Sequence, residues 1–462
     1  MVLDTSWIIN NYNGLTGSWL SFGRFGLVLT KKLLKLIPFN PYVACFLMLC
    51  SIFLFSIFLS FMFNYLTFEN KKSIASCIFP AVFLTAPLFA EQFNYVLQGF
   101  EVAFAIFLAS LAAFLVTKWV LNSKNVIHLI LSLAFMVWAF ASYQAVVFLY
   151  ISIVSSIYVL IYISNIKNKL NLKENFFKIS ILKYISTFIV SYFIYFVIDK
   201  LIKYTIGNSS YVDNMMMWGK EPLFKIIKEV LHYVKVSLLG DKLFYSRVFA
   251  IVVFLLVIYA LFNKCKDRLL FLLANLILVA SPFFLSLYLG RCLIPRMQFC
   301  YQYVLAFSLW ILFYISNKKF LKAVVVVFSL LFAFNQSYTI ARLFSTEQFK
   351  YEQDVRLANK ISYKIEELGL GEIPDYPIIL CGHHSNYVPN RVNGEIIGIS
   401  WFEYLGTAQP ALDLMRTLGY NYVYPTEEQA EKGKELAKNM PSWPSQGSVD
   451  FRDDLIIVKF SD

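Results

Sequence analysis

The sequence predicts an all-α polytopic membrane protein with about ten transmembrane helices and a small C-terminal α/β domain outside the membrane. The chain of 462 residues is 58% hydrophobic and only 15% charged, whereas soluble domains are about 45–50% apolar and about 25% charged. Its 46 Phe and 29 Tyr are typical of lipid contact and of the aromatic belts at membrane interfaces. These observations exclude an ordinary soluble protein.

The transmembrane helices are predicted from apolar segments of about 20 residues, the length that crosses a hydrocarbon core. The sequence has ten of them: 42–66, 76–97, 99–121, 126–144, 146–163, 179–199, 248–263, 269–288, 299–316 and 320–340. Two pairs of these segments are almost contiguous, 76–97 with 99–121 and 126–144 with 146–163, and each pair predicts a tight helical hairpin. A re-entrant segment remains an alternative near Pro80 and Pro87.

The orientation follows from the basic residues, which gather in every second loop. Lysine and arginine are enriched in cytoplasmic loops of membrane proteins. The net charge of +12 is therefore explained by membrane topology, and no nucleic-acid partner is predicted. The cytoplasmic loops lie near 71–72, 118–124, 167–178, 264–268 and 318–322. The outer segments are then 1–40, the turns near 98 and 145, 200–247, 289–298 and the tail from about 342.

Three domains are predicted. Residues 1–40 form a first outer loop, in which 20–37 pattern as an amphipathic helix in the interface. Its lysines, Lys31, Lys32 and Lys35, either meet anionic headgroups or form a solvated face. Residues 41–342 form the transmembrane domain.

Residues 343–462 form the soluble extracytoplasmic α/β domain. Its predicted elements are helices at 350–368, 409–418 and 426–439 and strands at 378–380 and 455–460. No apolar helix precedes the outer 1–40 segment. Either the chain inserts with its N-terminus outside or a preceding helix is absent from it, and we favour the second explanation.

Asp4 is the first candidate catalytic residue. A carboxylate at the lipid–water boundary can act as a general base on an acceptor hydroxyl or hold a divalent cation against a phosphate, although an N-terminal carboxylate is also often merely solvated. Arg24, which follows Gly23, offers a guanidinium that suits a pair of phosphate oxygens.

Further polar residues lie at the outer ends of the helices. Glu91, Asn94 and Glu101 are candidates because ionisable groups inside a membrane are costly and usually face a cavity or a partner; carboxylates that reach interfacial water are the alternative. Tyr143 and Gln144 lie in an outer turn, where the amide either binds a sugar hydroxyl or ties two helices together.

Arg291 and Arg296 lie in an outer loop, against the positive-inside bias. They either bind a phosphate or pair with Glu91 or Glu101. His383 and His384 lack a third ligand, so no metal site is predicted there. No nucleotide-binding loop is present, which favours a substrate that arrives already activated in the membrane.

The chain resembles the bacterial integral-membrane glucosyltransferases that modify O-antigen and convert serotype, the Gtr type II family. The motifs are short: Asp4 leading to Gly23-Arg24, 91–95 (EQFNY), 141–145 (ASYQA), 291–296 (RCLIPR) and 395–400 (EIIGIS). The sequence departs from the family pattern in lacking the helix before the first outer loop and in having Asp4-Thr5 where an acidic pair is frequent.

The resemblance implies a GT-C type fold in the bacterial inner (cytoplasmic) membrane, with the active site on the periplasmic face. The donor would be a polyprenyl-phosphate-linked hexose, commonly glucose, and the acceptor a lipopolysaccharide O-antigen or similar surface polysaccharide. Asp4 would be the base. Arg24, Arg291 and Arg296 would bind the donor phosphate, and the polar residues at positions 91, 94, 101, 143 and 144 would contact sugar or acceptor. The resemblance identifies no certain cofactor, and a divalent cation remains an alternative.

Two other classes remain as alternatives. A transporter or flippase for a lipid-linked sugar would carry charges near the bilayer midplane, where this sequence has almost none. An envelope polysaccharide polymerase also joins lipid-linked glycans at the outer face. An acyltransferase is disfavoured, because His128 lies at a cytoplasmic helix end.

Overall fold

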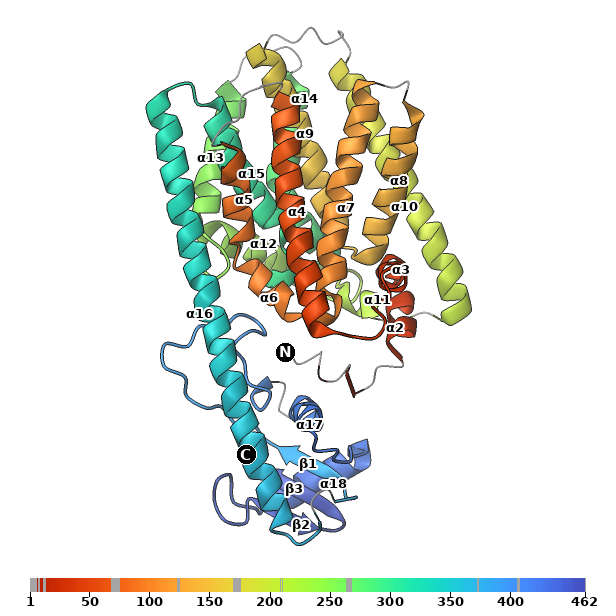
Figure 1. Cartoon of the computed structure of the whole chain (residues 1–462), viewed down its shortest axis with the longest axis vertical. Helices are drawn as coiled ribbons and strands as arrows, with labels where there is room; N and C mark the ends of the chain where they lie inside the picture. Colours follow the sequence, from red (N-terminus) through yellow and green to blue (C-terminus); the bar gives the residue numbers. More distant parts are fainter. Residues whose placement is uncertain are drawn as a thin grey trace. The chain divides into compact units, whose positions relative to one another are not determined.

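The computed structural model describes residues 6, 9–10, 14–67, 75–122, 125–168, 176–207, 209, 211–262, 268–371, 374–404 and 408–461. These residues divide into two compact units, coloured by sequence in Figure 1. The helical unit comprises Thr16–Tyr338, and the C-terminal unit combines Met1–Leu15 with Thr339–Asp462. Asp4 lies outside the described residues.

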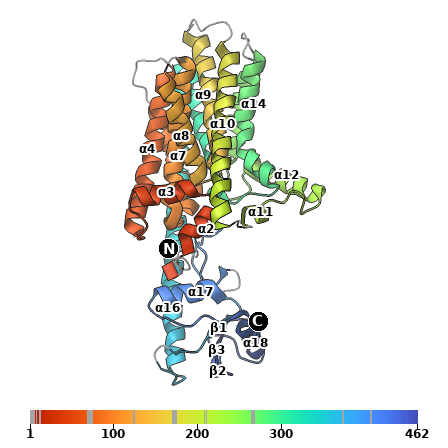
Figure 2. The ribbon, with the colours of Figure 1, turned by 90° about the vertical axis from the view of Figure 1, so that its right-hand side faces the viewer.

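The helical unit is built from apolar helices packed side by side, with short helices at one end (Figures 1 and 2). Its helices are α2 (Leu15–Ser21), α3 (Phe25–Leu33), α4 (Pro41–Thr67), α5 (Ala75–Leu84), α6 (Leu88–Asn94), α7 (Val96–Leu121), α8 (Val126–Ser142), α9 (Val146–Asn168), α10 (Phe176–Ile206), α11 (Tyr211–Met215), α12 (Leu223–Leu239), α13 (Arg247–Phe262), α14 (Arg268–Leu289), η2 (Pro295–Met297), α15 (Phe299–Ile315) and the first part of α16 (Lys319–Glu366).

Each predicted apolar segment coincides with a helix or, for 76–97, with a broken pair. Among the described residues six helices, α4, α7, α9, α10, α14 and α16, are long and apolar enough to cross a membrane. The pair α5–α6, bent by 58°, would make a seventh span, and α8, α13 and α15 are shorter apolar helices. The protein is therefore a multi-pass helical membrane protein, and its exact number of spans stays a prediction.

The break between α5 and α6 occurs where Pro87 cannot donate a backbone hydrogen bond. Side chains from other helices satisfy the polar groups of this region. Gln302 on α15 donates to the Val82 carbonyl at 2.6 Å, and the Thr85 hydroxyl donates to Gln336 at 3.0 Å. Such side-chain bonds are what allow a helix to break at membrane depth.

The predicted interfacial helix at 20–37 is two helices, because Gly23 turns the chain between α2 and α3. Gly23 has φ of +77°, and a Cβ there would lie 2.7 Å from Asp199 Oδ1. α3 packs closely on α8. A Cβ on Gly26 would lie 2.5 Å from the Trp138 carbonyl oxygen, and the Trp138 indole donates to the Thr30 hydroxyl at 2.9 Å.

The outer segment 200–247, predicted as a loop, contains a helix of four to five turns, α12. Pro222 precedes it and Gly240 ends it in the left-handed conformation. Ile226 and Tyr233 are buried, whereas Phe224 is 80% exposed. Figure 2 shows α12 inclined to the neighbouring long helices, the arrangement of a helix lying in the membrane interface.

The C-terminal unit has a three-stranded sheet in the order β1-β3-β2. β1 (Ile378–Cys381) pairs in parallel with β3 (Leu455–Lys459), and β2 (Val449–Arg452) pairs antiparallel with β3. The helices α17 (Ala408–Thr417) and α18 (Glu427–Ala437) complete it. The predicted strands and helices are present, but β2 was missed because its half-buried residues form no apolar run.

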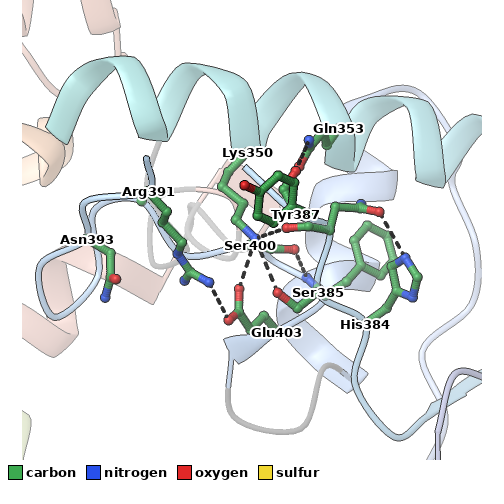
Figure 3. Close-up of polar contacts among 12 residues, drawn as sticks. Lys350, Gln353, His384, Ser385, Tyr387, Arg391, Asn393, Ser400 and Glu403 are labelled. Carbon is green, nitrogen blue, oxygen red and sulfur yellow. Dashed lines mark hydrogen bonds and ion pairs between the residues drawn. The ribbon is translucent and has the colours of Figure 1, made fainter. Parts of the chain in front are cut away.

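The segment 382–404 has no regular secondary structure and is fixed to α16 by buried polar contacts (Figure 3). Asp354, fully buried, accepts hydrogen bonds from the Ser400 hydroxyl at 2.6 Å and the Trp401 amide at 2.8 Å. Lys350, also fully buried, donates to the Asn386 carbonyl at 2.7 Å. Long ordered loops of this kind are commonly functional.

Glu403 adds an ion-pair network to these contacts. It lies 2.9 Å from Arg391 and 3.4 Å from Lys350. Burial raises the pKa of Glu403, but the hydrogen bond from Arg391 and the charge of Lys350 outweigh burial and hold that pKa below its usual value. The carboxylate therefore stays charged and keeps the segment in place at neutral pH.

The N-terminal residues of the C-terminal unit pack on its folded part. The Trp401 indole donates to the Ser6 hydroxyl at 3.4 Å, and the Asn10 amide donates to the Asp413 carbonyl at 3.2 Å. Ser6 is fully buried. Ser6 and Asn10, which follow Asp4 in the sequence, are thus held by contacts within this unit.

Candidate active site at one end of the helical unit

Arg24 is the centre of a polar cluster that joins segments distant in sequence. It immediately precedes α3 and donates to the Gln98 side chain of α7 at 2.9 Å. Its guanidinium carbon lies 5.4 Å from the centroid of the Tyr143 ring, a cation–π distance. The structure therefore brings together the predicted Arg24 and Tyr143.

Gln144 secures the turn that presents Arg24. Its amide donates to the Phe22 carbonyl at 2.7 Å and lies 3.5 Å from the Tyr195 hydroxyl of α10. The Tyr195 hydroxyl in turn donates to the Gly23 carbonyl at 3.4 Å. Of the two roles predicted for Gln144, the structure supports the one that ties elements together.

Arg296 extends the cluster to the loop between α14 and α15. It lies on η2 and donates to the Tyr95 hydroxyl, and its guanidinium carbon lies 4.3 Å from the Tyr95 ring centroid. The Tyr143 ring meets the Phe299 ring edge-on at a centroid distance of 6.0 Å. Four segments predicted to share one side of the membrane thus meet: 1–40 and the regions around 98, 145 and 296.

Arg291 lies in the same loop, half-buried, with a different set of contacts. Its carbonyl accepts from the Ser286 hydroxyl at 2.6 Å. Its guanidinium makes no hydrogen bond or ion pair with the described residues. The charge is therefore available to an anionic ligand.

The short helix α6 contributes buried polar side chains. Glu91, Gln92 and Asn94 are 1%, 4% and 6% exposed. Within the described part of the chain the side-chain nitrogens of Gln92 and Asn94 have no acceptor. A buried amide donor without an acceptor costs free energy, so these two donors mark a place where a ligand oxygen or a water is expected.

Glu101, one turn from Gln98 on α7, pairs with Lys31 of α3. The carboxylate and the ammonium are 2.8 Å apart and are 1% and 7% exposed. Lys31 also donates to the Leu97 carbonyl at 2.8 Å and lies 5.2 Å from the Trp19 ring centroid. Neither role predicted for Lys31, headgroup contact or solvation, is correct; the residue is buried because α3 packs against α7.

Asp199 is a buried carboxylate that the sequence prediction missed. It ends the apolar part of α10, is 9% exposed, and pairs with Lys203 at 2.7 Å. Its Oδ1 accepts no hydrogen bond from the described residues and faces Gly23. The rule that singled out Glu91, a carboxylate at a helix end, identifies Asp199 equally well.

A metal site is not formed by the side chains that the structure describes: no group of three or more His, Cys, Asp or Glu converges. Asp4, the predicted ligand or base, is outside these residues. The described residues of the cluster offer cationic groups, amide donors and aromatic rings. Cationic groups suit a phosphate, and amide donors and aromatic rings suit a sugar.

The sequence profile of a family described as Glucosyl transferase GtrII matches residues 2–313, more than half of the chain. The chain belongs to the GtrII glucosyltransferase family. The predicted family is thereby confirmed, and membership supports a glycosyltransferase with a sugar donor and a sugar acceptor. The GtrII match includes every residue of the cluster and ends before α16 begins. Comparison with curated proteins and with solved structures gave no match.

Proposed function

We propose that the protein transfers a hexose, commonly glucose in this family, from a polyprenyl-phosphate donor to a surface polysaccharide at the periplasmic face of the inner membrane. The observation that carries this proposal is the convergence of Arg24, Arg296 and the α6 amides at one end of the helical unit of a GtrII family member. The GT-C type fold and the periplasmic position of the C-terminal unit belong to the same proposal.

Arg24, Arg291 and Arg296 bind the donor phosphate. The Nε of Arg24 has no acceptor among the described residues, and guanidinium groups bind phosphate through paired hydrogen bonds. Asn94, with Glu91 and Tyr143, contacts the sugar. Glu101 and Gln144, predicted as sugar contacts, hold α3 and the α2–α3 turn in position.

Asp4 takes the proton of the acceptor hydroxyl. The acceptor oxygen then bonds to the anomeric carbon as the bond from that carbon to the phosphate oxygen breaks, and polyprenyl phosphate leaves with the electron pair. Attack from the face opposite the phosphate inverts the anomeric centre. The arginines stabilise the negative charge that develops on the leaving phosphate.

A groove between α9, α10 and α14 supports a lipid-linked donor. Its volume is about 400 Å³, and apolar and tyrosine side chains line it. Tyr150, Phe188 and Ala274 are among them. Isoprenoid units are branched hydrocarbons, which such a surface accepts.

The test is transfer in proteoliposomes. Purified protein is supplied with radiolabelled polyprenyl-phosphate glucose and an O-antigen-type acceptor, and we expect label on the acceptor together with release of polyprenyl phosphate. Movement of label across the bilayer without transfer would indicate a flippase. Joining of acceptor repeats without use of the hexose donor would indicate a polymerase, and either result refutes the proposal.

Replacing Arg24 with lysine is expected to lower transfer about 10-fold, because lysine keeps the charge and loses the planar fork that binds Gln98 and phosphate together. The rate is measured against donor concentration, and the effect is expected mainly on KM. Arg247→Lys, at an exposed position on α13, is the matched control. Equal rates for the two variants would remove Arg24 from the donor site.

A further inference from the structure

The C-terminal unit contains a polar pocket outside the residues matched by the GtrII family. Its volume is about 150 Å³, and it lies between α16, the segment 382–404 and Trp443. α16 supplies Gln353, Arg356 and Lys360, and the segment supplies His384 and Asn386. Figure 3 shows Gln353 on α16 and His384 on the adjacent segment.

The pocket carries the positive charges of Arg356 and Lys360, which are not paired with any of the described residues. Arg356 and Lys360 are one helical turn apart on α16, where like charges repel and reduce helix stability. Neither makes a hydrogen bond or an ion pair with the described residues, and no Asp or Glu is among the described residues that line the pocket. An anionic ligand would relieve this repulsion.

Other groups of the pocket suit a sugar ring. Trp443 offers an aromatic surface against which the apolar face of a pyranose packs. The Oε1 of Gln353 is buried and accepts no hydrogen bond from the described residues, while its Nε2 donates to the Tyr387 carbonyl at 3.0 Å. A sugar hydroxyl donating to that oxygen would satisfy it.

His384, Asn386 and Trp443 are held in place by contacts within the protein, before any ligand binds. Lys350 fixes the Asn386 carbonyl, and the Asn386 side chain lies 3.1 Å from His384 Nε2. The Trp443 amide donates to the Lys459 carbonyl of β3 at 2.8 Å. The pocket, of about 150 Å³, is too small for more than one sugar unit.

We propose that this pocket binds a monosaccharide unit that carries a carboxylate or a phosphate, with Arg356 and Lys360 on the acidic group and Trp443 against the ring. The site is separate from the transfer reaction and does not depend on it. It gives the C-terminal unit a role in holding an acidic carbohydrate.

The test is calorimetric titration of the full-length protein in nanodiscs of neutral lipid. We expect glucuronate or glucose 1-phosphate to bind at least about 10-fold more tightly than glucose, as for a charge-assisted contact. The preferred ligand identifies the source of the acidic group, a uronic acid or a sugar phosphate. Inorganic phosphate measures the contribution of the anion alone, and phosphatidylglycerol in the nanodisc tests competition by lipid headgroups.

Variants assign the binding to this pocket, because the helical unit is also proposed to bind a sugar. Arg356→Gln combined with Lys360→Gln is expected to weaken the acidic sugar by at least about 10-fold. Lys364→Gln, an exposed lysine one turn farther along α16 that pairs with Glu367, is expected to change affinity less than about 2-fold. Both positions of the double variant are exposed, so circular dichroism should show an intact fold.

Four results would overturn the proposal. They are equal affinity for glucose and the acidic sugars, inorganic phosphate binding as tightly as the preferred acidic sugar, unchanged affinity in the double variant, and full competition by phosphatidylglycerol. Full competition by phosphatidylglycerol would reassign the pocket to lipid headgroups.

Discussion

Replacing Asp4 with asparagine is expected to lower hexose transfer by about 10²–10⁴-fold, the usual contribution of a general base. Asparagine keeps the size of the side chain and cannot take the proton of the acceptor hydroxyl. The rate of transfer at saturating donor and acceptor measures this directly. Binding of the donor should change little, because the arginines that bind its phosphate are intact.

The matched control is Asp213→Asn, an exposed carboxylate in the 200–247 segment. It removes the same charge from a residue with no proposed role, and we expect its transfer rate to equal that of the unmodified protein. Membrane insertion of both variants is checked by protease protection. Unimpaired transfer by a correctly inserted Asp4→Asn protein would eliminate Asp4 as the base and direct attention to Asp199.

Replacing Lys31 with alanine is expected to destabilise the helical unit by about 3–5 kcal/mol, because it leaves the Glu101 carboxylate buried without its cation. The midpoint of denaturation in mixed micelles measures the loss. Replacing both members of the pair, as Lys31→Met with Glu101→Leu, should recover most of the stability, since no uncompensated charge remains.

A substitution in the same Lys31–Glu101 ion pair tests whether Glu101 has a structural role or contacts the substrate. Glu101→Gln should reduce stability and transfer together, because α3 and the turn that presents Arg24 depend on the ion pair. A Glu101→Gln protein with full stability and no transfer would instead make Glu101 a substrate contact. Exposed Lys32→Ala provides the reference for removing a charge from α3.

Local sequence patterns were sufficient for much of the fold. A run of about 20 apolar residues forms a helix in lipid whatever surrounds it, since every backbone polar group must be bonded within the segment. The strand at 378–381 and the helix at 427–437 are likewise encoded locally, the helix by the Thr426–Gln429 capping box. The region of the bend between α5 and α6 was predicted as a helix, with a re-entrant segment near Pro80 and Pro87 only as an alternative.

The candidate site was predicted in part. Polar residues at helix ends were recognisable one by one, and their shared sidedness followed from the basic loops. Their contact partners could not be predicted. Arg24 and Gln98 are far apart in sequence, as are Tyr95 and Arg296, and no local sequence rule pairs them. α12 was missed although its apolar residues recur with helical spacing, since the segment was treated as a loop.

The sequence by itself determined the membrane class, the apolar helices and the residue types at one end of them. Hydropathy and charge decide whether a segment lies in lipid or in water, and this does not depend on which other segments it contacts. Only the tertiary structure decided that Lys31 belongs to Glu101 and that Gly23 must lack a side chain beside Asp199. It alone also brought Arg356 and Lys360 beside Trp443 in a pocket. Each of these depends on contact between segments that are distant in the sequence, which is set by packing of the whole unit and not by any one segment.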